Sequence, residues 1–199
     1  MENIGFEPFF KEREWEWVAL EFGLGALFID TGADRGAIRR AAARACLFRL
    51  TEGREREPAK NERGAPVSPY GHLSLSHTRG GAAAAFHPSA RVGVDVERLD
   101  PKRVSPVYQK FMSPDEQRRF EAAPSVEFFF SVWSVKEAMF KIANAFIEEV
   151  SFRRELMVEP GFYDAGRGIG VVERPGFRME LELYRTFYGD YVFCGAIGR

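Results

Sequence analysis

The sequence has few residues of the kinds that build covalent or metal-based scaffolds. It contains two cysteines, Cys46 and Cys194, and three histidines, His72, His77 and His87, among 199 residues. Two cysteines cannot form a disulfide framework, and a Cys/His zinc site would have too few ligands to draw on. We therefore expect a protein of a reduced, cytoplasmic compartment.

An excess of charge of one sign is also missing. The 28 Lys and Arg residues face 29 Asp and Glu residues, which gives a net charge of −1. A protein that holds a nucleic-acid backbone or an anionic bilayer through its overall field needs a clear basic excess. The composition therefore argues against nucleic acid and membrane as partners, and any bound anion must be held by local groups.

Long apolar runs are absent too. No stretch approaches the roughly 18 apolar residues that a membrane-spanning helix needs. Glu2 and Glu7 precede any apolar run, unlike the start of a secretory signal. We expect neither a signal peptide nor a membrane span. A chain of 199 residues suits one large domain or two small domains that share an interface.

The first half of the chain predicts short strands, one helix and a meander. Strand patterns occupy residues 18–21 and 26–29, and an apolar stripe of helical spacing runs through residues 35–50. Residues 51–69 are charged and rich in Gly and Pro, which favours a surface loop. Three further segments are expected to pair as a meander of strands: residues 72–77, 82–86 and 91–99.

The second half begins with two helices. Ser113 to Glu116 form a capping box with Pro114 at the first helical position, which predicts a helix ending near Ala122. The longest helix is expected over residues 128–145, and β-structure beyond residue 150, with strands at 178–184 and 191–197. A helix followed by strands thus occurs twice, which indicates two similar halves.

An acidic pair lies within the segment Gly93-Val94-Asp95-Val96-Glu97. The valines share one strand face, so both carboxylates point to the other face, about 7 Å apart by strand rise. Oxygen ligands without nearby His or Cys suit Mg²⁺ better than zinc. A solvated acidic face is the plain alternative. Gly93 is expected to let a ligand approach the backbone closely.

The second feature is the helical segment from Trp133 to Lys141. Trp133, Glu137 and Lys141 are spaced four residues apart, so they share one face of the helix. A solvent-exposed Glu–Lys pair is the alternative interpretation. Trp133 favours a site, because a large aromatic ring on a polar face needs something to cover.

The third feature is Ser76-His77, which stands at a predicted strand end. Adjacent strand residues point to opposite faces, so the pair does not form a catalytic dyad by itself. Hydroxyl and imidazole groups are nevertheless good phosphate ligands. His72 and His87 are interpreted as structural, and nothing around the cysteines indicates a nucleophile.

In this order, the three features resemble the signatures of the 4′-phosphopantetheinyl transferases, in their longer surfactin-synthetase type. That family carries a Ser-His pair, then Gly-φ-Asp-φ-Glu with φ apolar, and then Trp-x-x-Lys-Glu-Ala-x-x-Lys. This chain has Ser76-His77, the second motif from Gly93 to Glu97, and the third from Trp133 to Lys141. The similarity is dense over residues 64–152 and faint elsewhere.

The resemblance implies an activity and a set of site residues. The family transfers 4′-phosphopantetheine from coenzyme A to a serine of an acyl or peptidyl carrier protein of fatty-acid, polyketide or peptide synthesis, and releases adenosine 3′,5′-bisphosphate. Asp95, Glu97 and Glu137 would hold Mg²⁺, or Mn²⁺, on the diphosphate. Glu137, Lys141 and His77 would have catalytic roles, with Glu137 as the base. The coenzyme A contacts implied are Ser76, His77, Lys136, Lys141, Gly64, Pro66 and Arg44.

One departure from the family pattern concerns the nucleotide end of coenzyme A. The family usually has Gly-Lys-Pro upstream of the Ser-His pair, where this chain has Gly64-Ala65-Pro66. The lysine normally helps to hold that end. The candidate substitutes are Arg39, Arg40, Arg44 and Arg63.

The resemblance also implies an α+β fold of two similar α/β halves, residues 1–99 and 100–199. Each half is expected to place a helix against a small antiparallel sheet, and the two to pack as a pseudo-two-fold dimer within one compact, monomeric unit. Two other functions stay open. One is a catalytically weak relative that binds coenzyme A or a carrier protein, and the other is a Mg²⁺-dependent nuclease, which the neutral charge disfavours.

Overall fold

The computed structural model describes residues 43–44, 47–48, 51–55 and 57–198, together with two short strands nearer the start of the chain. These strands, β1 (Glu16–Ala19) and β2 (Gly25–Phe28), pair antiparallel and overlap the two strands expected there. Most of the helix expected over residues 35–50, including Arg39, Arg40 and Cys46, lies outside the described residues.

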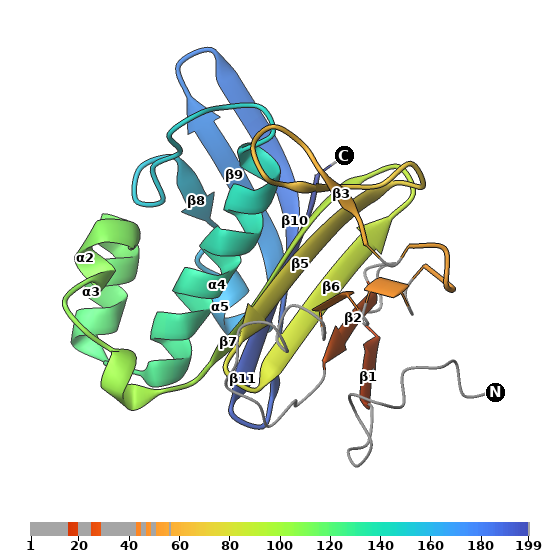
Figure 1. The fold of residues 1–199 in the computed structure, drawn as a ribbon. Coiled ribbons are helices and arrows are strands. Elements are labelled where there is room, and N and C mark those ends of the chain that lie inside the picture. The colour runs from red at the N-terminus through yellow and green to blue at the C-terminus, as the bar shows by residue number, and fades with distance from the viewer. Residues whose placement is uncertain are drawn as a thin grey trace.

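A five-stranded antiparallel sheet with the strand order β7-β11-β10-β9-β8 forms the centre of the described part. It joins one strand from the middle of the chain to four from its end, and helix α4 (Val126–Ala143) runs along one face, over β7 and β11 (Figure 1). The strand bounds are β7 (Arg91–Arg98), β8 (Leu156–Val158), β9 (Arg167–Arg174), β10 (Phe177–Tyr188) and β11 (Tyr191–Gly198).

The strands β5 (His72–Thr78) and β6 (Gly81–His87) form a hairpin, as the alternation predicted. The predicted meander is wrong in its third strand, because the backbone of β7 pairs with β11 and not with β6. Strand β5 instead runs beside β7 in the same direction. The amides of Val94 and Val96 in β7 donate to the hydroxyls of Ser74 and Ser76 in β5, at 3.1 and 3.3 Å. Side-chain hydroxyls thus satisfy donors that a paired strand would otherwise satisfy.

Local sequence signals fix both principal helices. Helix α3 (Pro114–Ala122) begins at the predicted capping box, in which Ser113 and Glu116 cap each other's backbone amides. Helix α4 begins two residues earlier than expected, because the hydroxyl of Ser125 accepts the amide of Phe128 at 3.1 Å. The buried side of α4 packs into the main core, with phenylalanines from α3 and the segment before it.

Short elements complete the described part. The loop expected over residues 51–69 contains the two-residue strands β3 and β4, which pair with each other. Their bounds and those of the short helices are β3 (Ala59–Lys60), β4 (Pro66–Val67), η1 (Pro101–Arg103), α2 (Tyr108–Phe111) and α5 (Phe162–Ala165). No helix within the described residues is both long enough and apolar enough to cross a membrane.

The fold is a mixed α and β arrangement of sheets and helices, as expected. The two-half pseudo-dimer and its boundary after residue 99 stay predictions. Strand β7 from the first expected half is hydrogen-bonded into the same sheet as the strands of the second.

Gly93 serves the packing of α4 onto β7. A Cβ atom at this position would lie 2.0 Å from the carbonyl oxygen of Ala138. The close approach that the sequence predicted is therefore made by a helix backbone, and the expectation of a ligand at Gly93 is wrong. The same contact sets how near the polar face of α4 lies to Asp95 and Glu97.

We expect Gly93→Ala to destabilise the fold by about 2–4 kcal/mol, because the helix backbone must move to admit the methyl group. Chemical denaturation monitored by circular dichroism measures this loss. Gly161→Ala is the matched control, since its added Cβ would have no neighbour within 4 Å. An unchanged unfolding free energy for Gly93→Ala would contradict the packing argument.

Candidate active site

The polar residues of β7 and α4 face each other. Along β7 the side chains of Val92, Val94 and Val96 enter a small core with β6 and β11. Strand alternation sends Asp95 and Glu97 to the opposite side of the sheet, where α4 lies. The tertiary fold thus packs the acidic face of β7 against a helix. The alternative interpretation, a strand whose acidic face is exposed to solvent, is wrong.

Asp95 is 6% exposed and is held from two elements. Its Oδ1 accepts a hydrogen bond from the Ser76 hydroxyl at 2.7 Å and one from Lys141 Nζ at 3.0 Å. Lys141 also donates to the carbonyl of Val94 at 2.7 Å. The other oxygen of Asp95, Oδ2, is buried and has no hydrogen-bond partner. A buried carboxylate oxygen without a donor is costly, so this atom is placed to meet a further cation or donor.

Glu97 is held by three donors. Its Oε1 accepts from the Trp133 indole at 3.1 Å, and its Oε2 from Arg103 at 2.9 Å and from Thr78 at 3.3 Å. Burial, followed by repulsion from Asp95, raises the pKa of Glu97, and Arg103 opposes part of this. Trp133 therefore positions one acid of the pair, beyond its role in packing.

Glu137 on α4 is the third acid of the cluster, and its carboxyl pKa is strongly raised. Burial raises the pKa of Glu137 to about 7, the charges of Asp95 and Glu97 add to the shift, and Lys141 opposes it. The contributions of Asp95 and Glu97 show that their carboxylates lie near that of Glu137. A carboxyl group with a pKa near neutrality can take up or release a proton at physiological pH.

The three acids are the residues expected to hold a divalent cation. Across the described parts of the chain, no group of three or more His, Cys, Asp or Glu side chains is arranged to hold a metal ion. The expected site is thus not preformed, because Lys141, Arg103 and Trp133 occupy oxygens of Asp95 and Glu97. The donor chemistry nevertheless fits a hard divalent cation, since the ligands are all oxygens and Asp95 Oδ2 lacks a partner.

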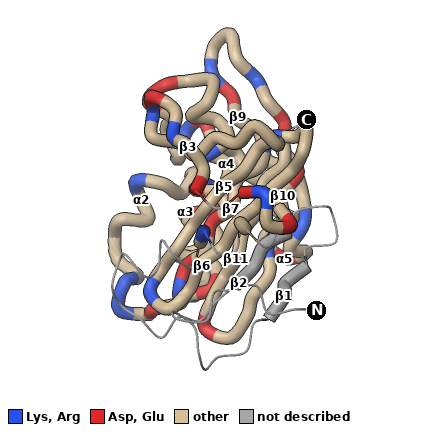
Figure 2. Tube along the Cα trace, turned by 45° about the vertical axis from the view of Figure 1, so that its right-hand side comes forward, with Lys and Arg blue, Asp and Glu red and all other residues tan. Residues whose placement is uncertain are grey.

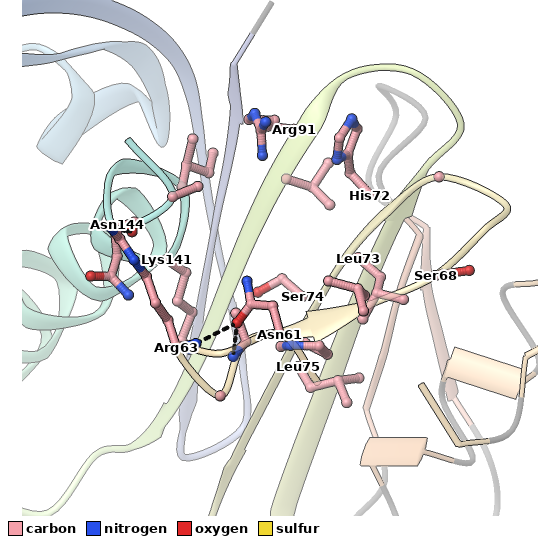
Figure 3. A pocket seen from close by; sticks show the side chains of 18 of the residues that line it. Asn61, Arg63, Ser68, His72, Leu73, Ser74, Leu75, Arg91, Lys141 and Asn144 are labelled. Atoms are coloured by element: carbon pink, nitrogen blue, oxygen red, sulfur yellow. Dashed lines mark hydrogen bonds between the residues drawn. The ribbon is translucent and has the colours of Figure 1, made fainter. Parts of the chain in front are cut away.

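A cavity of about 650 Å³ adjoins Lys141, between the loop around residues 61–72 and the end of α4. Lys141 lines it (Figure 3). Gly64, Ala65 and Pro66, from the loop that departs from the family pattern, line it too. Arg63, another lining residue, crosses to the end of α4, where it donates to the carbonyl of Asn144 at 2.6 Å and to Glu148 at 3.1 Å. This volume lies within the usual range for pockets that bind small molecules and cofactors.

The structure does not bring Lys136 to this cluster. Its side chain is fully buried, and its ammonium donates to the carbonyls of Phe111 and Phe152, at 2.9 and 3.0 Å, and to Glu116 at 2.7 Å. Burial lowers the pKa of Lys136, and Glu116 opposes the shift. The expected contact of Lys136 with a phosphate is not supported by this placement, since every proton of the ammonium already has a protein acceptor.

Of the other residues expected to contact coenzyme A, some lie in this site and some do not. Ser76 lies in the site through Asp95, whereas His77 follows it on β5 and is exposed. Arg44 is exposed, bonds to Glu57 at 3.2 Å and is not among the residues that line the cavity. Arg39 and Arg40 lie outside the described residues.

Sequence reasoning missed several residues that complete the site. Thr78 and Arg103 hold Glu97, and Arg91 and His72 line the cavity. Thr78 follows the alternation of Ser74 and Ser76, which was a usable signal. Arg103 and Arg91 carry no motif, and only the fold reveals them. Figure 2 shows basic and acidic positions interspersed along the described chain, in keeping with local rather than overall anion binding.

Residues 91–157 match the family model of the 4′-phosphopantetheinyl transferase superfamily. No curated protein matches the sequence. Among solved structures, the chain is similar to the holo-[acyl-carrier-protein] synthase of Thermotoga maritima, with 16% identity and a TM-score of 0.37. That match covers 54% of this chain and 62% of the other, less than two thirds of its length.

Proposed function

We propose that this chain, whose residues 91–157 match the family model of the 4′-phosphopantetheinyl transferase superfamily, makes holo-carrier proteins from coenzyme A. It transfers the 4′-phosphopantetheine group to a serine of an apo acyl or peptidyl carrier protein and releases adenosine 3′,5′-bisphosphate. The observation that carries this proposal is the meeting of Asp95, Glu97, Glu137 and Lys141 beside a cavity whose described lining residues include no acid.

The reaction is a displacement at phosphorus. The serine hydroxyl oxygen of the carrier forms a bond to the phosphorus that bears pantetheine. The bond from that phosphorus to the oxygen of the adenosine 5′-phosphate breaks, and the electron pair leaves with adenosine 3′,5′-bisphosphate. Such a reaction asks the protein mainly for positioning, charge neutralisation and a proton acceptor.

Residues of this chain can supply these functions. Glu137 accepts the serine proton, which its pKa of about 7 allows at neutral pH. Lys141 offers a positive charge at the point where the cavity meets Asp95. His77 remains a proposed phosphate contact, reached from the exposed side of β5.

A divalent cation fits the acidic donors. Asp95, Glu97 and Glu137 would hold Mg²⁺ or Mn²⁺, and Oδ2 of Asp95 is a ligand oxygen that has no hydrogen-bond partner. When bound, the ion supplies positive charge to the diphosphate of coenzyme A. We further propose a monomeric, cytoplasmic chain that acts on a carrier of fatty-acid or polyketide synthesis.

One incubation tests the proposal. The purified full chain is mixed with coenzyme A, MgCl₂ and an apo carrier protein, and the mass of the carrier is measured by mass spectrometry. We expect the carrier to gain the mass of one phosphopantetheine group, and excess EDTA to abolish the gain. Binding of coenzyme A without transfer would favour the weak, binding-only relative. Full transfer in EDTA would contradict the role given to the three acids.

A further inference from the structure

The basic side chains that line the cavity differ in whether an acid neutralises them. Four basic residues line it: Arg63, His72, Arg91 and Lys141. Its described lining residues include no Asp or Glu. Lys141 is paired with Asp95 at 3.0 Å, and Arg63 with Glu148 at 3.1 Å. The charges of Lys141 and Arg63 are therefore already compensated when no ligand is bound.

Arg91 is not compensated. Its guanidinium has no hydrogen bond or ion pair to any residue within the described ranges, and lies over the ring of Phe146 with 4.4 Å to the ring centroid. Burial, followed by the charge of Arg91, lowers the pKa of the neighbouring His72, which favours the neutral imidazole. An arginine that faces a cavity without an acid partner is suited to a bidentate contact with a phosphate.

The position of Arg91 separates it from the acids. In Figure 3 Arg91 and His72 lie at one end of the cavity, while Lys141 and Arg63 lie toward the other. Lys141 is the lining residue that is bonded to Asp95, so the acids mark its end of the cavity. A ligand that spans the cavity therefore needs one anionic group near Lys141 and a second, separate one near Arg91.

We infer that Arg91 is the specificity-determining residue that holds the isolated phosphate monoester of the nucleotide. This deepens the proposed function and rests on it for the identity of the ligand. Coenzyme A has a diphosphate and a separate 3′-phosphate on its ribose. With the diphosphate beside Lys141 and the acids, the 3′-phosphate is the remaining group that can meet Arg91. Phe146 positions the guanidinium by supporting its flat face.

Isothermal titration calorimetry of the full chain tests this with two ligands. Wild-type protein should bind coenzyme A more tightly than dephospho-coenzyme A, which lacks the 3′-phosphate. Arg91→Ala should weaken coenzyme A binding by about five- to twentyfold, since a charged hydrogen bond at a half-exposed site gives part of its full value. Binding of dephospho-coenzyme A should change by less than about twofold, because the variant removes no contact to it.

Further variants separate charge from packing. Arg91→Lys keeps the charge and loses the fork geometry, so we expect an affinity for coenzyme A between those of wild type and Arg91→Ala. Arg178→Ala is the control for removal of an arginine, because Arg178 pairs with Glu173 and Glu180 and is not among the lining residues. It should bind both ligands as wild type does.

The outcomes distinguish the inference from the function on which it rests. Transfer by the wild-type chain, with equal losses for both ligands in Arg91→Ala or with no loss, overturns the role of Arg91 alone. The expected selective loss without any transfer to an apo carrier supports Arg91 and overturns the proposed function. A wild-type chain that binds neither ligand overturns both.

Discussion

Glu137→Gln is expected to reduce phosphopantetheine transfer by about 10²- to 10³-fold while the protein stays folded. Glutamine keeps the shape of the side chain but cannot accept the serine proton or contribute negative charge toward a cation. The mass-spectrometric transfer assay measures the rate. Glu180→Gln is the matched control, because Glu180 is bonded to Arg178 on an exposed part of β10. A wild-type rate for Glu137→Gln would contradict the proposed role.

The same variant should stabilise the metal-free protein at alkaline pH. The pKa of Glu137 in the folded state is about 7, above its ordinary value of 4.5. Between these pH values the folded state binds more protons than the unfolded state, so stability falls as pH rises and stays reduced above about pH 7. With a discount for the partial exposure of the group, the gain of Glu137→Gln over wild type at about pH 8 is about 1–2 kcal/mol.

Denaturant titrations without metal at about pH 5 and about pH 8 check the sign, since the advantage of Glu137→Gln should nearly vanish at the lower pH, where Glu137 is protonated. Addition of MgCl₂ should raise the stability of wild type at about pH 8 more than that of the variant. An equal advantage at both pH values would exclude titration of Glu137 as its cause.

Lys136→Met is expected to destabilise the fold by about 3–5 kcal/mol, because it leaves the buried carboxylate of Glu116 without its cation. Glu116 Oε2 is 2.7 Å from Lys136 Nζ, and Glu116 Oε1 accepts the Tyr163 hydroxyl at 2.5 Å. The carbonyls of Phe111 and Phe152 also lose a donor. For a chain of this length the loss corresponds to a fall in Tm of roughly 6–20 °C.

Two companion variants identify the cause. Lys110→Met removes a lysine from an exposed position of α2 and should change stability by less than about 0.5 kcal/mol. Adding Glu116→Gln to Lys136→Met removes the uncompensated charge, so the double variant should be more stable than Lys136→Met alone. A phosphate role for Lys136 predicts the opposite pattern, with unchanged stability and a raised KM for coenzyme A.

Lys136 and Glu137 are adjacent in the chain, but their side chains lie in different surroundings, so we expect different effects from their substitution. The rings of Phe111 and Phe152, whose carbonyls bind Lys136, pack on Trp133 with centroids 5.2 and 5.8 Å away. Trp133 in turn donates to Glu97. Lys136 thus supports the wall behind the acids, while Glu137, one position later, points toward them.

Several features of this protein follow from the sequence alone, because their causes are local. The capping box at Ser113 starts a helix independently of the rest of the fold, since the backbone amides that it satisfies lie within one turn. Strand alternation places Asp95 and Glu97 on one face, and helical spacing aligns Trp133, Glu137 and Lys141, by backbone geometry alone. The motifs that resemble those of the superfamily, and the segment that matches its family model, are built from these local patterns.

The tertiary structure alone decided what each of those faces meets. The choice of β11 as the partner of β7 and the hydroxyls of Ser74 and Ser76 along β5 depend on segments distant in the chain. Gly93 allows contact with a helix backbone instead of a ligand, and Lys136 points into the core instead of the cavity. Local periodicity gives the direction of a side chain relative to its own element, but burial and charge pairing depend on which elements pack together.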